Sequence, residues 1–492
     1  MLTNRAASRL WPVWGWYFSR VIARSASSGA LNGRDVDRGR ESLSEGVTHP
    51  VDARPPAAPL VVLAFQHVIT MYAGAVTVPL VIGAGLHLAN AQTAYLVSAD
   101  LMACGIVTLI QCIGVFGVGV RMPVIMGVSF VGVAPAIAIA SNPALGLPGV
   151  FGATIVSGLI GLLIAPLFGR APRVFAPVVI GMAMLLIGVS LLDVAVNWIG
   201  GTGGAAVHPA NVAVAALVAA TILAVVRFGR GFVGDIAILI GVTVGFIAAS
   251  LLGWVNLSDA AGAGWFRLVR PFWFGMPRFD PAAIGAMTLV LIVAMIESSG
   301  MLFNLGRIVD RPLTGPDLTR GLRGDAVGAI IGGLFSSLPY TSYSQNVAVV
   351  AMTGVKSRWV GAAAGVILIL LATVPKLAFL VTAIPSPVLG GAALVMFGVV
   401  AASGVQVLAQ VDFTHNRRNL YVVALGLGIG LIPVVAPKFL AGLPASMSLL
   451  QNGVLLGIVA TIVLNLVLNG GEAAQTDLAA TVARVIPQEA PQ

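Results

Sequence analysis

Charged residues are scarce in this sequence of 492 residues: Asp, Glu, Lys and Arg together make up 9% of it, whereas 58% of the residues are hydrophobic. The mean hydropathy is +0.99. A soluble domain carries about 25% charged residues, and no water-soluble fold could cover so much apolar surface. The composition therefore excludes a soluble globular protein and indicates an integral membrane protein.

Cysteine is equally scarce, because the chain has only Cys104 and Cys112. Both are expected on one membrane helix, which excludes a disulfide framework and a metal cluster built on cysteine. The sequence has no HExxH or CxxC motif, so we expect no metal and no cofactor. It also lacks a nucleophile–base pair and a phosphate-binding loop, which argues against a membrane-bound enzyme.

Apolar segments recur along most of the chain. Those of about 17 to 25 residues are long enough to cross the hydrocarbon core of a bilayer as helices. The sequence predicts an all-α polytopic membrane protein with fourteen transmembrane segments, at 59–83, 92–116, 123–140, 148–168, 173–192, 211–227, 232–252, 283–304, 321–336, 340–355, 358–380, 387–405, 419–437 and 446–468.

Two tails are expected to flank this membrane domain of residues 56–470. Residues 1–55 are rich in arginine and read as a cytoplasmic tail, and residues 471–492 as a second one. The N-terminal segment has neither the uninterrupted apolar core nor the clear cleavage site of a signal peptide. An interfacial anchor and a misassigned start codon remain the alternatives for it.

The net charge of +9 could suggest a nucleic-acid partner, but the basic residues lie between the apolar segments and form no stripe. An even number of spans puts both termini on one side. With a cytoplasmic N-terminus, 22 of the 27 basic residues lie inside, and the outside keeps Arg267, Arg270, Arg278, Lys376 and Lys438. The positive-inside rule therefore predicts an inner (plasma) membrane protein with both termini in the cytoplasm.

Two predicted segments are poor membrane helices. Each opens with a proline and a β-prone stretch before a short helix-like run: MPVIMGVSFVGVAPAIAIA from Met122 and LPYTSYSQNVAVVAMTGV from Leu338. They are third in the first seven segments and third in the second seven. This predicts an inverted repeat of 59–252 and 283–468 with short strands in segments 3 and 10. Because non-helical backbone in a membrane must be buried or line a cavity, we expect the binding site there.

Carboxylates inside membrane segments are functional candidates because an unpaired charge there is costly. Glu297, in LVLIVAMIESSGMLFNLGR, lies deep in the eighth segment beside small residues. Its alternative is a neutral carboxyl that a neighbouring helix satisfies. Asp325 begins the ninth segment and is either functional or a simple N-terminal helix carboxylate. Asp100 is a structural hydrogen-bond partner or a functional group, and Asp193 and Asp235 are expected as solvated or capping groups at helix ends.

Other polar groups also fall inside segments. His67 lies mid-segment and is a satisfied core histidine or a proton relay. The densest polar run extends from Tyr340 to Asn346. Within it, the Gln345 carboxamide offers a donor and an acceptor side by side, which matches the N–H and C=O edge of a purine, while a carboxylate can accept from two ring N–H groups. Phe130, in the corresponding segment of the first half, either stacks on a ring or packs.

These residues resemble the nucleobase-cation symporter-2 family, also called the nucleobase-ascorbate transporters, over nearly all of residues 59–468. Gln345, Asn346, Thr353 and Gly354 fit the family signature Q-N-x-G-x-x-x-x-T followed by R, K or G, and Ala348 stands where glycine is usual. The stretches AFQHVITMYAGAVTVPLVIG, SADLMACGIVTLIQ and MIESSGM are also similar.

The resemblance implies a core domain that moves against a gate domain in an elevator-like manner, and a homodimer. By position, it implies that the base is bound by Glu297, Gln345, Phe130 and Ser344. It implies proton coupling or a supporting role for His67, Asp325 and Asn346. Specificity would then be modulated by Ser129, Met301, Ala348 and Thr353.

The stretches PYTSYSQNV and ESSGM are similar to the xanthine and urate branch of this family. The resemblance therefore implies import of a purine base, urate or xanthine, by proton symport. The partners would be the base, protons, the lipid bilayer and a second copy, with no nucleic acid. The alternatives are a carrier of uracil or another nucleobase, an uncoupled facilitator and, more remotely, an inorganic-anion exchanger of similar architecture.

Overall fold

The computed structural model describes residues 49–170, 176–200, 207–230, 232–436, 439 and 453–470. Most of the predicted N-terminal tail and all of the C-terminal one lie outside these residues, as does the Asp235 side chain. The first half of the membrane domain contains α3 (Ala57–Gly85), α4 (Asn90–Ile113), β1 (Met126–Val128), the 3₁₀ turn η2 (Phe130–Gly132), α5 (Val133–Ala140), α6 (Gly146–Arg170), α7 (Pro177–Gly200), α8 (Pro209–Phe228), α9 (Phe232–Asp235) and α10 (Ala237–Leu251).

The short helix α11 (Ser258–Gly262) lies between the halves. The second half contains α12 (Pro281–Ile308), α13 (Gly315–Leu334), β2 (Tyr340–Ser342), α14 (Ser344–Thr353), α15 (Arg358–Ala372), α16 (Pro375–Thr382), α17 (Ser386–Leu408), α18 (Arg418–Val435) and α19 (Gly453–Asn469). Every one of the predicted ranges contains a helix. The prediction of an all-α multi-span membrane protein with two short strands is therefore confirmed.

The number of full-length apolar spans is smaller than predicted. Among the described residues, eight helices are long and apolar enough to cross a membrane, or nine if α15 and α16, which meet at a bend of 80°, form one span. The apolar helices Phe130–Ala140, Ala237–Leu251 and Gly453–Asn469 are shorter. Helix α13 has 20 residues but carries Asp317, Arg320, Arg323 and Asp325, and these charges distinguish it from an ordinary apolar span.

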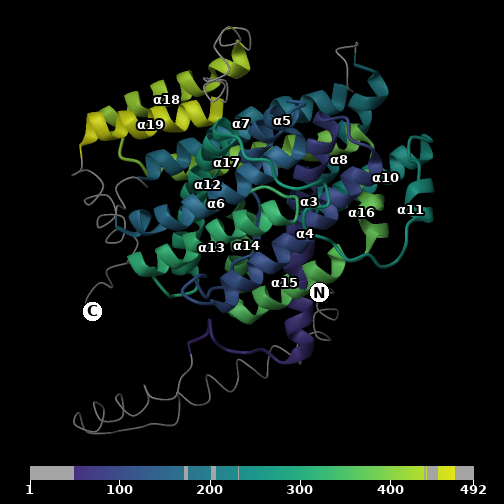
Figure 1. Cartoon of the computed structure of the whole chain (residues 1–492), viewed down its shortest axis with the longest axis horizontal. Coiled ribbons are helices and arrows are strands. Elements are labelled where there is room, and N and C mark those ends of the chain that lie inside the picture. The colour runs from purple at the N-terminus through teal and green to yellow at the C-terminus, as the bar shows by residue number, and fades with distance from the viewer. Residues whose placement is uncertain are drawn as a thin grey trace, which may run out of the picture. The chain divides into compact units, whose positions relative to one another are not determined.

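Helices from the two halves pack in pairs: α4 against α15, α6 against α13, and α7 against α17. Small residues permit the close approach, as is usual between membrane helices. A Cβ on Gly105 of α4 would lie 2.5 Å from the carbonyl oxygen of Gly365 in α15. Figure 1 shows α18 and α19 side by side, and both also contact α7.

Helix α7 ends later than the sequence predicts. The sequence places Asp193 at the end of a segment, but the helix continues to Gly200. Asp193 is therefore an exposed residue inside the helix, and its carboxylate accepts a hydrogen bond of 3.2 Å from the Asn197 side chain one turn later. The predicted segment stops at the carboxylate, although apolar residues such as Val194 and Trp198 continue the helix beyond it. The prediction therefore missed the last turns of α7.

Candidate functional site

The two broken segments meet through the short strands that the sequence predicts in segments 3 and 10. Strand β1 pairs with β2 in antiparallel register, with Met126 opposite Ser342 and Val128 opposite Tyr340. The amide of Ser129 extends the ladder by donating to the Pro339 carbonyl at 2.8 Å. Proline disfavours a helical conformation of the residue before it, which suits the extended backbone that leads into β2.

Close backbone approach at this crossing depends on a glycine. A Cβ on Gly127, in the middle of β1, would fall within the ring of Tyr343, the residue that precedes α14. The Tyr343 hydroxyl donates to the Val128 carbonyl at 3.2 Å, and its amide donates to the Ile125 carbonyl at 3.0 Å. Tyr343 therefore fastens the start of α14 onto the other broken segment.

Glu297 lies on α12, directly against this crossing. Its neighbour Ser298 accepts a hydrogen bond of 2.9 Å from the Ser342 amide, and the Ser298 and Thr341 hydroxyls are 3.1 Å apart. The polar residues of β2 therefore hold the turn of α12 that carries Glu297.

The four residues implied in substrate binding share one property. Glu297, Gln345, Phe130 and Ser344 are all only partly buried, whereas the surrounding polar groups are fully buried. Helix α12 contacts both η2, which begins with Phe130, and α14, which begins with Ser344. The first amides of α14 have no partners within the helix and form its electropositive end. A carboxyl, a carboxamide and an aromatic ring thus lie on adjoining elements with free surface.

The Phe130 ring packs edge-to-face on Phe397 of α17, with centroids 5.4 Å apart. The position of Phe130 is therefore compatible with both alternatives, stacking on a substrate ring and packing within the protein. The contact with Phe397 leaves part of the Phe130 ring exposed.

His67 and Asn346 are brought together by α3 and α14. The Asn346 Nδ2 donates to the His67 backbone carbonyl at 3.0 Å and lies 3.1 Å from Nδ1 of the same residue. Both side chains are buried, with 2% and 1% exposed for His67 and Asn346. Asn346 therefore ties the signature helix to the first span rather than facing the open side of the site.

One of the two expectations for Asp325, a carboxylate at the N-terminus of a helix, is wrong. Helix α13 begins at Gly315, where Thr314 and Asp317 form the capping box, so Asp325 is not an N-terminal carboxylate. It is fully buried, and its Oδ1 accepts from Gln111 Nε2 at 3.3 Å. The position was misjudged because the polar first turns of α13 were assigned to a loop.

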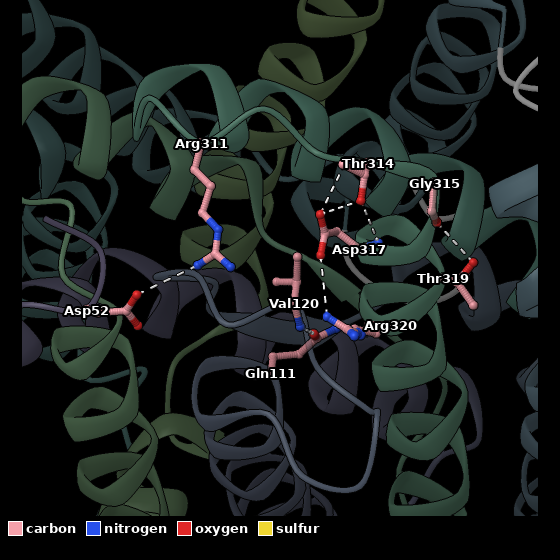
Figure 2. A network of polar contacts seen from close by, with 9 residues as sticks. All are labelled: Asp52, Gln111, Val120, Arg311, Thr314, Gly315, Asp317, Thr319 and Arg320. Atoms are coloured by element: carbon pink, nitrogen blue, oxygen red, sulfur yellow. Dashed lines mark hydrogen bonds and ion pairs between the residues drawn. The ribbon is translucent and has the colours of Figure 1, made fainter. Parts of the chain in front are cut away.

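Gln111 of α4 is a functional candidate that the sequence reasoning missed. Its Nε2 also donates to the Gly321 carbonyl at 2.7 Å, and its Oε1 accepts from the Val120 amide at 3.1 Å. Figure 2 shows Gln111 beside Val120. A lone carboxamide in the apolar run GIVTLIQ is the signal that could have revealed it, because a buried amide needs partners.

Asp100 supports the other end of β2. Its Oδ1 accepts from the Ser337 hydroxyl and from the Tyr340 hydroxyl, each at 2.8 Å. This favours the structural interpretation of Asp100, as a partner of the side-chain hydroxyls at the entry into β2. A small apolar cavity lies nearby and is lined by residues such as Leu96 and Ser336. Glu297 and Gln345 do not line it, so it is separate from the candidate site.

The residues implied in specificity occupy different positions. Ser129 is fully buried where β1 passes into η2, and Met301 is buried one turn after Glu297. Ala348 is exposed one turn after Gln345. Thr353 is in the last turn of α14, about 12 Å along the helix from Gln345. Its hydroxyl bonds to the Val349 carbonyl at 2.8 Å and accepts from the Val355 amide at 3.3 Å, so it terminates the helix.

Comparisons with known proteins find matches that extend over most of the chain. The xanthine/uracil permease model, described as a permease family, matches residues 58–439. The uric acid transporter UacT of Escherichia coli strain K12 is 47% identical over 427 residues, which cover 86% of this chain and 89% of that protein. The xanthine permease of Bacillus subtilis strain 168 is 40% identical over 410 residues, which cover 83% and 93% of the two chains.

Among solved structures, SLC26A9 aligns with a TM-score of 0.57 at 11% identity and covers 95% of this chain and 72% of that one. This likeness concerns the fold alone, which is SLC26-like. The family match includes α3 to α18 and thereby both broken segments, Glu297 and Gln345. The chain therefore belongs to the xanthine/uracil permease family, and it is a multi-pass membrane permease rather than an enzyme.

Proposed function

We propose that this permease imports a purine base, urate or xanthine, together with protons. Relatives at 47% and 40% identity are a uric acid transporter and a xanthine permease. The observation that carries the proposal is the partly exposed pair Glu297 and Gln345 on adjoining helices, with Phe130 on η2, which also contacts α12. A carboxyl group accepts from a ring N–H and, when protonated, also donates through its O–H, a carboxamide matches an adjacent N–H and C=O, and a phenyl ring stacks on the base.

The mechanism that we propose is elevator-like alternating access. Helices α3–α6 and α12–α16 with the strands form the core domain, and α7, α8, α10 and α17–α19 form the gate domain. Most helix contacts fall within these two groups, and Phe130 with Phe397 is one of the contacts between them. The core and gate would each draw on both halves of a seven-plus-seven inverted repeat. A homodimer in the plasma membrane with cytoplasmic termini completes the proposal.

Glu297 takes the proton in this mechanism. A membrane-embedded carboxyl is most easily kept in its neutral form, and the base then binds to the loaded site. Ser298 holds α12 against β2 by accepting from the Ser342 amide, and Gln111 and Asp325 join α4 to α13. His67 and Asn346 hold the start of α14 in place for the same site.

The decisive experiment is uptake of labelled urate and xanthine into cells that lack their own purine carriers, with and without a protonophore. Accumulation that the protonophore abolishes supports proton symport, and the preferred base identifies the substrate. Accumulation that persists with the protonophore would instead indicate another coupling ion. Equilibration without accumulation would indicate an uncoupled facilitator.

The role of Glu297 has its own test. Glu297→Gln keeps the size of the side chain but cannot cycle a proton, so it should abolish accumulation against a gradient. Asp193→Asn is the matched control, because Asp193 is an exposed carboxylate on α7 outside the site. Concentrative uptake by Glu297→Gln at the unmodified rate would refute the assigned role.

A further inference from the structure

The two helices that carry Glu297 and Gln345 are joined at their far ends. Helix α12 ends at Ile308, and Asp310 follows with a φ of 57°. Helix α14 ends at Thr353, and the left-handed Gly354 precedes Lys356 by two residues. Lys356 and Asp310 form an ion pair. A direct charge contact therefore connects the C-terminal turns of the two site helices.

A second link runs through Asp52, which precedes α3. Its Oδ1 is 2.7 Å from Arg358 Nε at the start of α15, and its Oδ2 is 3.9 Å from Arg311 Nη1 after α12. Figure 2 shows the Arg311 side chain reaching toward Asp52. One carboxylate thus joins the loop after α12 to the start of α15, the helix that follows α14. We call Asp52, Asp310, Arg311, Lys356 and Arg358 the brace.

Backbone hydrogen bonds seat the chain around Asp52. The Arg358 amide donates to the Val51 carbonyl at 2.9 Å, and the Ser357 hydroxyl donates to the Ala53 carbonyl at 2.6 Å. The Trp359 indole donates to the Asp52 carbonyl at 3.2 Å. These contacts give Asp52 a defined position, which a solvated carboxylate in a flexible tail would not have.

Arg358 extends the brace to the helix that supports the site. Its Nη1 donates to the carbonyls of Cys112 at 3.3 Å and Ile113 at 3.0 Å, at the end of α4. The preceding residue, Gln111, bonds to Asp325. The brace therefore reaches α12 and α14, which carry Glu297 and Gln345, and also α4 and α15.

Partly exposed ion pairs contribute little to stability, and the Asp310 side chain is 74% exposed. The brace acts through geometry rather than through stability. Oppositely charged pairs at defined positions restrict how far the C-terminal ends of α12 and α14 can separate. We infer that the brace positions Glu297 relative to Gln345 and so sets the affinity for the base. Its five members are positioning residues for binding. This inference rests on the proposed function.

The test is a charge exchange. Asp310→Lys or Lys356→Asp alone should raise the KM for purine uptake at least fivefold with little change in the amount of protein in the membrane. The double exchange should restore KM to within twofold of the unmodified chain. Asp52→Asn should raise KM in the same direction. Arg307→Gln is the control, because it removes an exposed charge from the last turn of α12 outside the brace.

A KM within twofold of the unmodified value in both single variants would overturn the inference, as would failure of the double exchange to restore it. Hydrogen exchange of residues 344–358 in purified protein tests the brace without transport. Faster exchange in each single variant, with recovery in the double exchange, supports it, and unchanged exchange overturns it. If the unmodified chain takes up neither base, the proposed function fails, and hydrogen exchange still decides whether the brace restrains α14.

Discussion

Asn346 of α14 holds His67 of α3 through one nitrogen, since its Nδ2 donates to the His67 carbonyl at 3.0 Å and lies 3.1 Å from the ring nitrogen. A single buried carboxamide thereby spans two elements that are far apart in the sequence. The neighbouring Gln345 is only partly buried. The consecutive carboxamides of the signature thus divide between a structural contact and a free surface.

Loss of the Asn346 contact should impair transport. Asn346→Ala leaves the His67 ring without this partner, and an unsatisfied buried polar group costs about 1–3 kcal/mol. We expect the maximal rate of purine uptake to fall about tenfold. Asn346→Asp should be worse, because a carboxylate cannot donate to a carbonyl. Met352→Leu, at an exposed position of the same helix, should match the unmodified chain; equal rates for all variants would contradict the prediction.

The strand crossing should not tolerate a side chain at Gly127. Because a Cβ there would overlap the Tyr343 ring, Gly127→Ala must displace the start of α14. We expect at least a hundredfold loss of uptake at normal membrane levels, or failure to reach the membrane. Gly285→Ala is the control, since nothing lies within 4 Å of a Cβ at that position. Near-normal uptake by Gly127→Ala would show that the crossing is looser than the structure indicates.

Gln111 should matter for stability. Gln111→Leu removes hydrogen bonds to the Gly321 carbonyl, the Asp325 carboxylate and the Val120 amide. At about 1 kcal/mol each, and more where a buried group is left unpaired, the loss is about 2–4 kcal/mol. Thermal unfolding of the purified protein should shift to lower temperature. Ser141→Ala, which removes an exposed hydroxyl, serves as the comparison, and identical melting of the two variants would disprove the role.

The contact between Phe130 and Phe397 should influence affinity. An aromatic pair contributes about 0.5–1.5 kcal/mol beyond its buried area. Phe397→Leu keeps an apolar side chain but removes the edge-to-face partner, so the Phe130 ring loses its defined orientation. The KM for the base should rise about two- to tenfold. Leu394→Val, at an exposed position on the same helix, should leave KM unchanged. An unchanged KM in Phe397→Leu would mean that Phe130 is oriented by other contacts.

Much of the architecture follows from local sequence patterns, and such patterns can be recognised without the structure. Proline followed by a β-prone stretch twice at corresponding places indicated the two strands, and Glu297 and the polar run at Gln345 stood out against apolar surroundings. Two of the errors lie at helix boundaries. Charges near the start of α13 and Asp193 near the end of α7 looked like loop residues, because a polar side chain that finds a partner in the fold has the same sequence signal as one in solvent.

The sequence by itself determined the membrane class, the order of the helices and which residues are candidates for the site, because these follow from composition, periodicity and residue type. Only the tertiary structure decided which of these residues meet. The bond from Asn346 to His67, the support of Asp325 by Gln111 and the ion pairs of Asp52 join positions that lie between 214 and 306 residues apart. No local pattern encodes such pairs, since they depend on how the two halves of the chain pack against each other.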